Sequence, residues 1–94
     1  MARLSLEKHK NRTVSIFPNP TTENTTVSFE LEKSCNMKIL LCDVLGIELA
    51  NVYEGFANEG LFTETIDIGN LPKGVYFLKI LIDGNYTVEK VIVE

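Results

Sequence analysis

The sequence has very few histidines and cysteines, the residues on which most zinc sites and nucleophilic active sites depend. It contains one histidine, His9, which lies in an N-terminal stretch that we expect to be a tail. Zinc sites are built mainly from clustered cysteine and histidine ligands, and serine or cysteine nucleophiles need a histidine docked into the fold. A glycine-rich phosphate-binding loop is also missing. We therefore expect no catalytic residue, no metal site, no cofactor and no enzymatic activity.

Only two cysteines occur, Cys35 and Cys42, and they flank an expected strand over Met37–Leu41. An extended segment of this length separates its ends by roughly 20 Å, at about 3.3 Å per residue. A disulfide requires Cα atoms within about 7 Å, so the two cysteines should not pair within one chain. Their spacing also lacks the C-x-x-C pattern of metal and redox sites. We expect two half-buried free thiols.

Long apolar runs are absent as well, and so are basic clusters beyond residues 3–12. The formal net charge is −4, and lysine and arginine gather only between Arg3 and Arg12, which argues against nucleic acid as a partner. No apolar run approaches the ~20 residues that span a bilayer, so we expect no membrane insertion. The N-terminus has no apolar stretch typical of signal peptides. Any signal peptide would therefore lie outside this chain.

What the sequence does contain is a regular series of short β-strands. Hydrophobic residues make up 45% of the 94 residues and charged residues 23%, as in ordinary globular domains with one core. Polar and apolar residues alternate most clearly over Thr25–Glu32, which indicates a half-buried strand. We expect strands at Thr13–Phe17, Thr25–Glu32, Met37–Cys42, Ile47–Tyr53, Leu61–Ile68, Leu71–Asp83 and Tyr86–Glu94. This pattern predicts an all-β domain over residues 13–94, a small seven-stranded antiparallel Ig-like (Greek-key) β-sandwich, after a linker or tail over residues 1–12.

Two of the connections have recognisable composition. Asp43 and Gly46 occupy the first and fourth positions of a hairpin turn in which the glycine adopts a left-handed conformation. Residues 54–60 contain two glycines and an asparagine, and we expect them to form a loop.

Other polar and aromatic residues have ordinary interpretations. The carboxylates of Glu30, Glu32 and Glu64 are expected on polar strand faces. Tyr53 and Phe56 could make a small contact patch, or belong to a loop that folds over one end of the sandwich.

The longest apolar run follows a corner that contains Pro72 and Gly74. Proline has no amide donor, so the preceding strand must end by Leu71, and glycine can take a positive φ without steric cost. The run that continues to Asp83 is apolar on both faces, which predicts a central strand. A tyrosine just inside such a strand, here Tyr76, can donate its hydroxyl to upstream backbone and lock the corner.

Four segments carry a further pattern. Ile16–Thr21 contains an aromatic residue followed by Pro-Asn-Pro, and Lys38–Leu49 contains a hairpin with the spacing D-x-x-G. Ile68–Phe77 contains L-x-x-G-x-Y. Thr87–Glu94 is a closing strand in which Lys90 is followed by three apolar residues.

In this order and at these spacings, the four segments resemble the type A C-terminal sorting domain of the type IX secretion system of certain Gram-negative bacteria. The resemblance covers Val14–Glu94. The chain departs from the family at Cys42, where an aromatic residue is common, and at Glu94, where many members end in a basic or amide residue.

The resemblance implies an address label rather than an enzyme. A cargo protein linked to the N-terminal side would enter the periplasm and then be recognised by an outer-membrane translocon and its shuttle protein. A sortase would remove the domain, and the cargo would be released or attached to the cell surface.

We hypothesise that partner recognition is carried by the proline corner and the end of the last strand. The strand Tyr86–Glu94 could offer an edge for strand addition. The hypothesised recognition residues are Pro18, Asn19, Pro20, Lys90, Val91, Ile92, Val93 and Glu94. The structural landmarks are Gly46, Leu71, Gly74 and Tyr76.

Two other classes of protein fit the same fold. One is a non-catalytic Ig-like adhesion or carbohydrate-binding accessory module, for which aromatic residues aligned on one sheet face would be expected. The other is a structural spacer domain.

Overall fold

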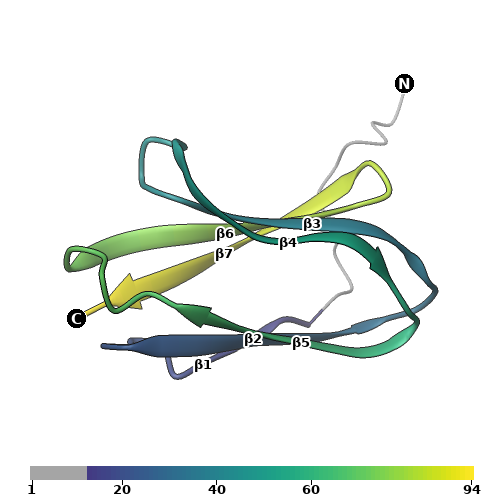
Figure 1. Cartoon of the computed structure of the whole chain (residues 1–94), viewed down its shortest axis with the longest axis horizontal. Helices are drawn as coiled ribbons and strands as arrows, with labels where there is room; N and C mark the ends of the chain where they lie inside the picture. The colour runs from purple at the N-terminus through teal and green to yellow at the C-terminus, as the bar shows by residue number, and fades with distance from the viewer. Residues whose placement is uncertain (1–12) are drawn as a thin grey trace.

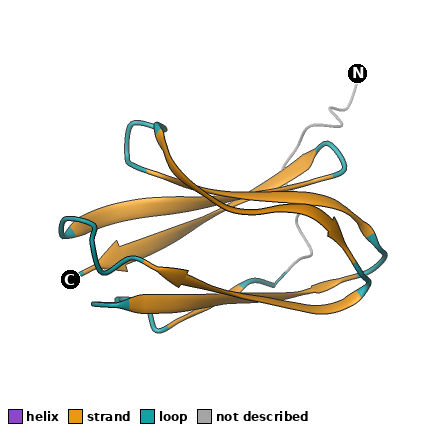
Figure 2. Ribbon diagram, viewed as in Figure 1, coloured by secondary structure: helices purple, strands orange, loops and turns teal. Residues whose placement is uncertain are grey.

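The computed structural model describes residues 13–94, which form two packed β-sheets (Figures 1 and 2). The predicted tail over residues 1–12 lies outside the described residues. The strands are β1 (Ser15–Phe17), β2 (Asn24–Leu31), β3 (Cys35–Cys42), β4 (Glu48–Ala57), β5 (Gly60–Asp67), β6 (Gly74–Ile82) and β7 (Asn85–Val93).

The two sheets divide the strands unevenly. One sheet has the order β1-β2-β5 and the other the order β4-β3-β6-β7. Every pair of neighbouring strands is antiparallel, and the two sheets lie face to face in Figure 1. The predicted seven-stranded antiparallel β-sandwich is therefore confirmed.

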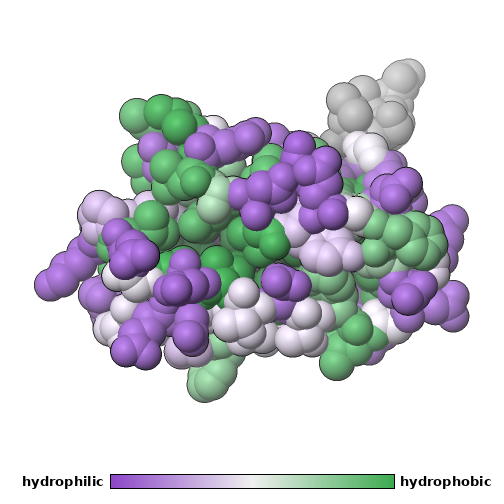
Figure 3. Space-filling view, viewed as in Figure 1, coloured by the Kyte–Doolittle hydropathy of each residue, from purple (hydrophilic) through white to green (hydrophobic). Residues whose placement is uncertain are grey.

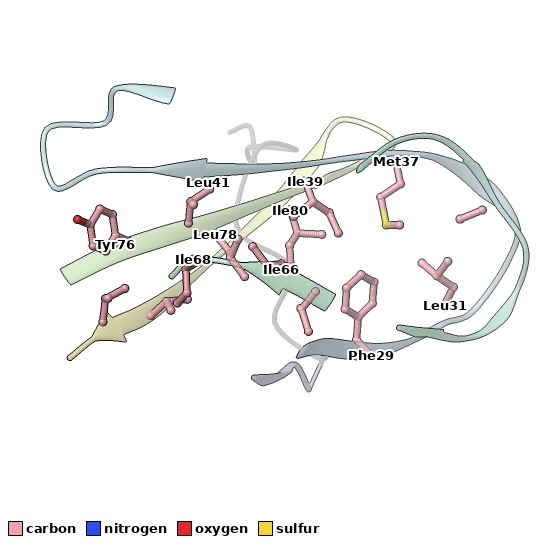
Figure 4. Packing of buried hydrophobic residues seen from close by; sticks show 14 of the residues in the cluster. Phe29, Leu31, Met37, Ile39, Leu41, Ile66, Ile68, Tyr76, Leu78 and Ile80 are labelled. Carbon is pink, nitrogen blue, oxygen red and sulfur yellow. The ribbon is translucent and has the colours of Figure 1, made fainter. Parts of the chain in front are cut away.

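Side chains from both sheets meet in a single core between the layers (Figure 4). Val27, Ile39, Leu78 and Val91 come from β2, β3, β6 and β7, and none of them has exposed surface. Burial follows every second residue along β2, as the alternation of polar and apolar residues predicts. The hydrophobic effect thus acts on one face of β2, whereas β3 also buries Leu40 and Cys42, which lie outside the core cluster.

The corner before β6 connects the two sheets and is locked by a tyrosine. The chain leaves β5 in the three-stranded sheet and enters β6 between β3 and β7 in the other sheet, so the predicted central strand is confirmed. The hydroxyl of Tyr76 donates a hydrogen bond of 2.5 Å to the carbonyl oxygen of Pro72. Leu71 packs against the core, and its amide donates to the carbonyl of Ile68. The side chain of Tyr76 is buried, so this bond is shielded from water.

The hairpin between β3 and β4 has the predicted turn. Gly46 has a φ of 86°, and its amide donates to the carbonyl of Asp43. The carboxylate of Asp43 also accepts hydrogen bonds from the amides of Leu45 and Ile47. An aspartate at the first turn position therefore satisfies amides that the strands leave unpaired.

The predicted loop over residues 54–60 is wrong, because β4 continues to Ala57. Residues 54–57 pair with the first half of β3, with Ala57 opposite Cys35. Gly55 sits in this strand with a φ of 148° and open space where a Cβ would be. Glycine and asparagine are local turn signals, but pairing with the long strand β3 outweighs them. Only residues 58 and 59 connect β4 to β5.

Tyr53 and Phe56 therefore lie on β4 and not in a loop. The Tyr53 hydroxyl donates to the Phe56 carbonyl oxygen over 2.6 Å. The Tyr53 ring packs edge-on against Phe62, with the ring centroids 4.9 Å apart.

Glu64 is not on a polar strand face. It stands opposite Val27, which is fully buried, and directly opposed residues in an antiparallel pair share a face. Its carboxylate thus points from the edge strand β5 toward the core side, where it is half-buried. An inward charge of this kind discourages a further strand from pairing with a sheet edge.

The two cysteines occupy the two ends of β3 and are free thiols, as predicted. Both side chains are buried, which is deeper than the half-buried state expected from the sequence. Cys35 belongs to the core between the sheets.

We predict that Tyr76→Phe lowers the free energy of unfolding by ~1–3 kcal/mol, because the Pro72 carbonyl loses a buried hydrogen-bond donor. Urea denaturation measures this change. Tyr86→Phe is the matched control, since Tyr86 is exposed and no hydrogen bond of its hydroxyl occurs among residues 13–94. Equal stability of the two variants would contradict the role of the tyrosine in the corner.

We predict slow alkylation of Cys42 in the folded domain. Burial raises the pKa of its thiol, Glu48 and Asp43 add to the rise, and Lys79 opposes it. Since only the thiolate reacts, iodoacetamide should modify Cys42 in a Cys35→Ala background at least about tenfold more slowly in buffer than in urea. A raised folded pKa also means that the thiol's contribution to stability is present below the unfolded pKa and is lost as pH rises through the folded pKa. Similar alkylation rates in buffer and urea would refute a protected thiol.

Candidate recognition site at the terminal strand

The two hypothesised recognition segments lie side by side in the structure. Pro18–Pro20 follows β1, and Lys90–Glu94 ends the chain along β7, the edge strand of the four-stranded sheet. About 70 residues of sequence separate them, as the intervals of 71 and 73 residues across their hydrogen bonds show. The peptide bonds that precede Pro18 and Pro20 are both cis.

The side chain of Asn19 pairs with the backbone of β7. Its Nδ2 donates to the carbonyl oxygen of Lys90 over 2.9 Å, and its Oδ1 accepts from the amide of Ile92, also over 2.9 Å. A neighbouring strand would offer β7 the same donor and acceptor. The carboxamide thus takes the place of a strand at this edge.

Thr21 continues the pairing with its own backbone. Its amide donates to the Ile92 carbonyl over 2.9 Å, and its carbonyl accepts from the Glu94 amide over 2.8 Å. These bonds form a parallel bridge between Thr21 and Val93. We refer to residues 18–21 as the capping segment, because they cover the second half of the β7 edge.

The capping segment is itself held by two threonine hydroxyls. The Thr21 hydroxyl donates to the Asn24 carbonyl, and the Thr25 hydroxyl donates to the Pro18 carbonyl, each over 2.7 Å. Both threonines are buried, with 4% and 1% of their surface exposed. The proline corner is therefore fixed to β2 as well as to β7.

Only part of the hypothesised set is available to a partner. Val91 and Val93 are buried in the core, and Ile92 is half-buried. The exposed members are Pro18, Asn19, Pro20, Lys90 and Glu94. The capping segment also lines one side of a shallow hollow of about 280 Å³, together with residues 22–24.

The structural landmarks Gly74 and Tyr76 stand opposite Val93 and Val91 in the sheet. The corner that begins β6 is therefore the cross-strand neighbour of the candidate site, although it contributes no exposed recognition residue. Gly46 lies apart from it, in the hairpin between β3 and β4.

Sequence reasoning missed the role of Thr21 and Thr25. A threonine after a Pro-Asn-Pro turn is a common hydrogen-bonding residue in turns, but the sequence does not show that its backbone reaches the end of the chain.

Sequence reasoning also missed an exposed apolar tip on the hairpin between β3 and β4. Four side chains there have 43–79% of their surface exposed, those of Val44, Leu45, Ile47 and Leu49. Figure 3 shows the apolar surface of this hairpin at the upper left of the molecule.

Within the described part of the chain, no group of three or more histidine, cysteine, aspartate or glutamate side chains could hold a metal ion. Residues 13–94 also form no helix that is long and apolar enough to cross a membrane.

Comparison with known proteins identifies the family. No curated protein matches the sequence. The family described as "Secretion system C-terminal sorting domain" matches residues 15–94, from the first residue of β1 to Glu94. A domain of this kind acts with a secretion machinery on a cargo at its N-terminal side, and its presence indicates a secreted or cell-surface protein. The chain belongs to the C-terminal sorting domains of the type IX secretion system.

Proposed function

We propose that this domain directs an N-terminal cargo from the periplasm across the outer membrane, and that it has no catalytic activity of its own. The observation that carries the proposal is the family match, which spans every strand of the sandwich. In this proposal the translocon and its shuttle protein bind the folded domain. A sortase then cuts on the N-terminal side of the domain, and the cargo is secreted or attached to the cell surface.

The recognition surface in this proposal is the exposed part of the candidate site. The capping segment and the end of β7 are brought together only by folding, because their contact joins residues far apart in sequence. Two prolines and four backbone or carboxamide hydrogen bonds to β7 hold this surface in one geometry. A preorganised surface loses little entropy on binding, which suits a signal shared by different cargoes.

The adhesion or carbohydrate-binding alternative lacks a supporting observation. Among the described residues, the exposed aromatic side chains are Phe17, Phe56 and Tyr86. They lie on β1, β4 and β7, which belong to two different sheets. They therefore do not align along one sheet face as a stacking platform for sugars would require.

We predict that the exposed charges at the end of β7 are needed for export. A reporter with a signal peptide is fused to the domain in a bacterium with this secretion system, and reporter in the medium is compared with reporter in the periplasm. The double variant Lys90→Glu/Glu94→Lys keeps the net charge but reverses both local charges, and we expect it to lower export at least about tenfold by removing charge complementarity.

The matched control is Glu32→Lys/Lys33→Glu, an exposed charge exchange in the turn between β2 and β3. Denaturation midpoints confirm that both double variants are folded. Deletion of residues 90–94 is expected to abolish export, but it also removes the core residues Val91 and Val93 and cannot separate recognition from folding. Normal export of that deletion would refute the role of the last strand altogether.

We predict that Asn19→Ala destabilises the domain by ~1–2 kcal/mol, because the Lys90 carbonyl and the Ile92 amide lose their partners. Asn19→Asp should not restore stability, since a carboxylate cannot donate to the Lys90 carbonyl. Urea denaturation gives the stability, and hydrogen exchange of the Ile92 amide reports the local opening.

Asn58→Ala, in the turn after β4, is the control for this pair of variants. The free energy of unfolding, and the free energy of opening at the Ile92 amide from hydrogen exchange, should both stay within about 0.5 kcal/mol of their original values, as is usual for surface substitutions. An Ile92 amide that exchanges at the same rate in all variants would show that the carboxamide does not hold the edge.

A further inference from the structure

The four edge strands of this sandwich are protected to different degrees. β1 has only three residues, and the pairing of β4 with β3 is interrupted by two register shifts. β5 carries the inward carboxylate of Glu64 opposite Val27. Short strands, bulges and inward charges all discourage pairing with another chain. On β7 the capping segment covers the edge only from Lys90 onward.

Within residues 13–94, no segment pairs with the outer edge of the first half of β7. The carbonyls of Lys90 and Ile92 and the amides of Ile92 and Glu94 face away from β6, since they bind the capping segment. Backbone groups of an antiparallel strand alternate in direction, so the amides and carbonyls of Tyr86 and Val88 face the same side. No hydrogen bond from residues 13–94 to these outward groups is present.

A groove lies beside this edge, on the outer face of the four-stranded sheet, and it is apolar along β7 but also lined by the charged residues Asp43, Glu48 and Lys79. It has a volume of about 440 Å³, and Phe77, Tyr86 and Val88 form its β6 and β7 side. The hairpin between β3 and β4 forms the other side, to which the exposed apolar tip contributes only Val44. Lys79 Nζ lies 5.6 Å from the centre of the Tyr86 ring and helps to hold it in place.

The inner face of this edge, which is turned toward the other sheet, carries polar side chains. Glu89 lies on this face together with Thr87, and it stands opposite Leu78 of β6. A carboxylate disfavours an apolar neighbour at that position. A strand added to this edge should therefore place apolar side chains toward the outer groove and polar side chains toward Glu89.

We propose that residues 86–90 of β7 are a docking edge for an extended partner segment with alternating apolar and polar residues. Added to the four-stranded sheet as a fifth strand, the segment gains main-chain hydrogen bonds from Tyr86, Val88 and the Lys90 amide, and the outer groove selects its apolar side chains. The capping segment supports an extended occupant, because it already seats Thr21 against Val93 of the same edge.

For the identity of the partner, this inference rests on the proposed function: the segment would belong to a component of the secretion machinery. Binding of an extended segment is a property of the domain itself and can be tested without that machinery.

The probe is a short capped peptide in which valine and threonine alternate between terminal lysines, titrated into the labelled domain. We expect the amides of Tyr86, Val88 and Lys90 to shift in the NMR spectrum and to exchange more slowly with solvent. Val88→Pro removes one outward amide at an edge position where proline is tolerated, and should weaken peptide binding at least about tenfold. Val88→Thr keeps the amide and the branched shape, and should retain binding within about threefold.

Shifts that are absent, or that map to β1, β4 or β5, would overturn the proposal even if Val88→Pro did not fold. Shifts of residues 86–90 with domain concentration alone would also overturn it, because the edge would then bind a second copy. Export of the reporter fusion separates the two proposals. If the unaltered domain fails to export, the sorting function fails, whereas normal export of a folded Val88→Pro variant rejects only the docking edge.

Discussion

The pairing of Asn19 and Thr21 with β7 closes one side of the sandwich, and the rest of the structure depends on that closure. On the opposite side, β4 and β5 are joined by a two-residue connection between the sheets. On the β1–β7 side, by contrast, the sheets are linked by hydrogen bonds from the capping segment. Without them the edge of β7 would expose backbone groups next to buried Val91 and Val93, which is costly for a small domain.

The same interaction explains why the family's two most distant elements belong together. The Pro-Asn-Pro corner is not explained by local turn geometry alone, because the side chain of its asparagine uses both polar atoms in hydrogen bonds to residues 90 and 92. The tyrosine corner supports the arrangement from the other flank, because Tyr76 and Gly74 pair with Val91 and Val93. The last strand is therefore held by β6 on one edge and by the capping segment on the other.

Local patterns predicted much of this fold, because strands and turns leave short-range traces in a sequence. Alternation revealed the buried face of β2, Asp43 and Gly46 revealed a hairpin, and Pro72, Gly74 and Tyr76 revealed the corner. The end of β4 was missed, because it is decided by pairing with β3. The inward face of Glu64 was missed because its charge was given more weight than the period of two that places it between Phe62 and Ile66. Both segments of the candidate site were named from family resemblance. Their contact, and the burial of Val91 and Val93 between them, depend on bonds across about 70 residues that no periodic pattern records.

The parallel direction of the bridge between Thr21 and Val93 has a mechanical consequence. A tensile load applied between a cargo on the N-terminal side and the C-terminal end of β7 pulls two parallel segments in opposite directions. The load then runs along the segments, so the hydrogen bonds of Asn19 and Thr21 are sheared together instead of being unzipped one at a time. The domain should therefore resist unfolding under a force applied between its N-terminal and C-terminal ends.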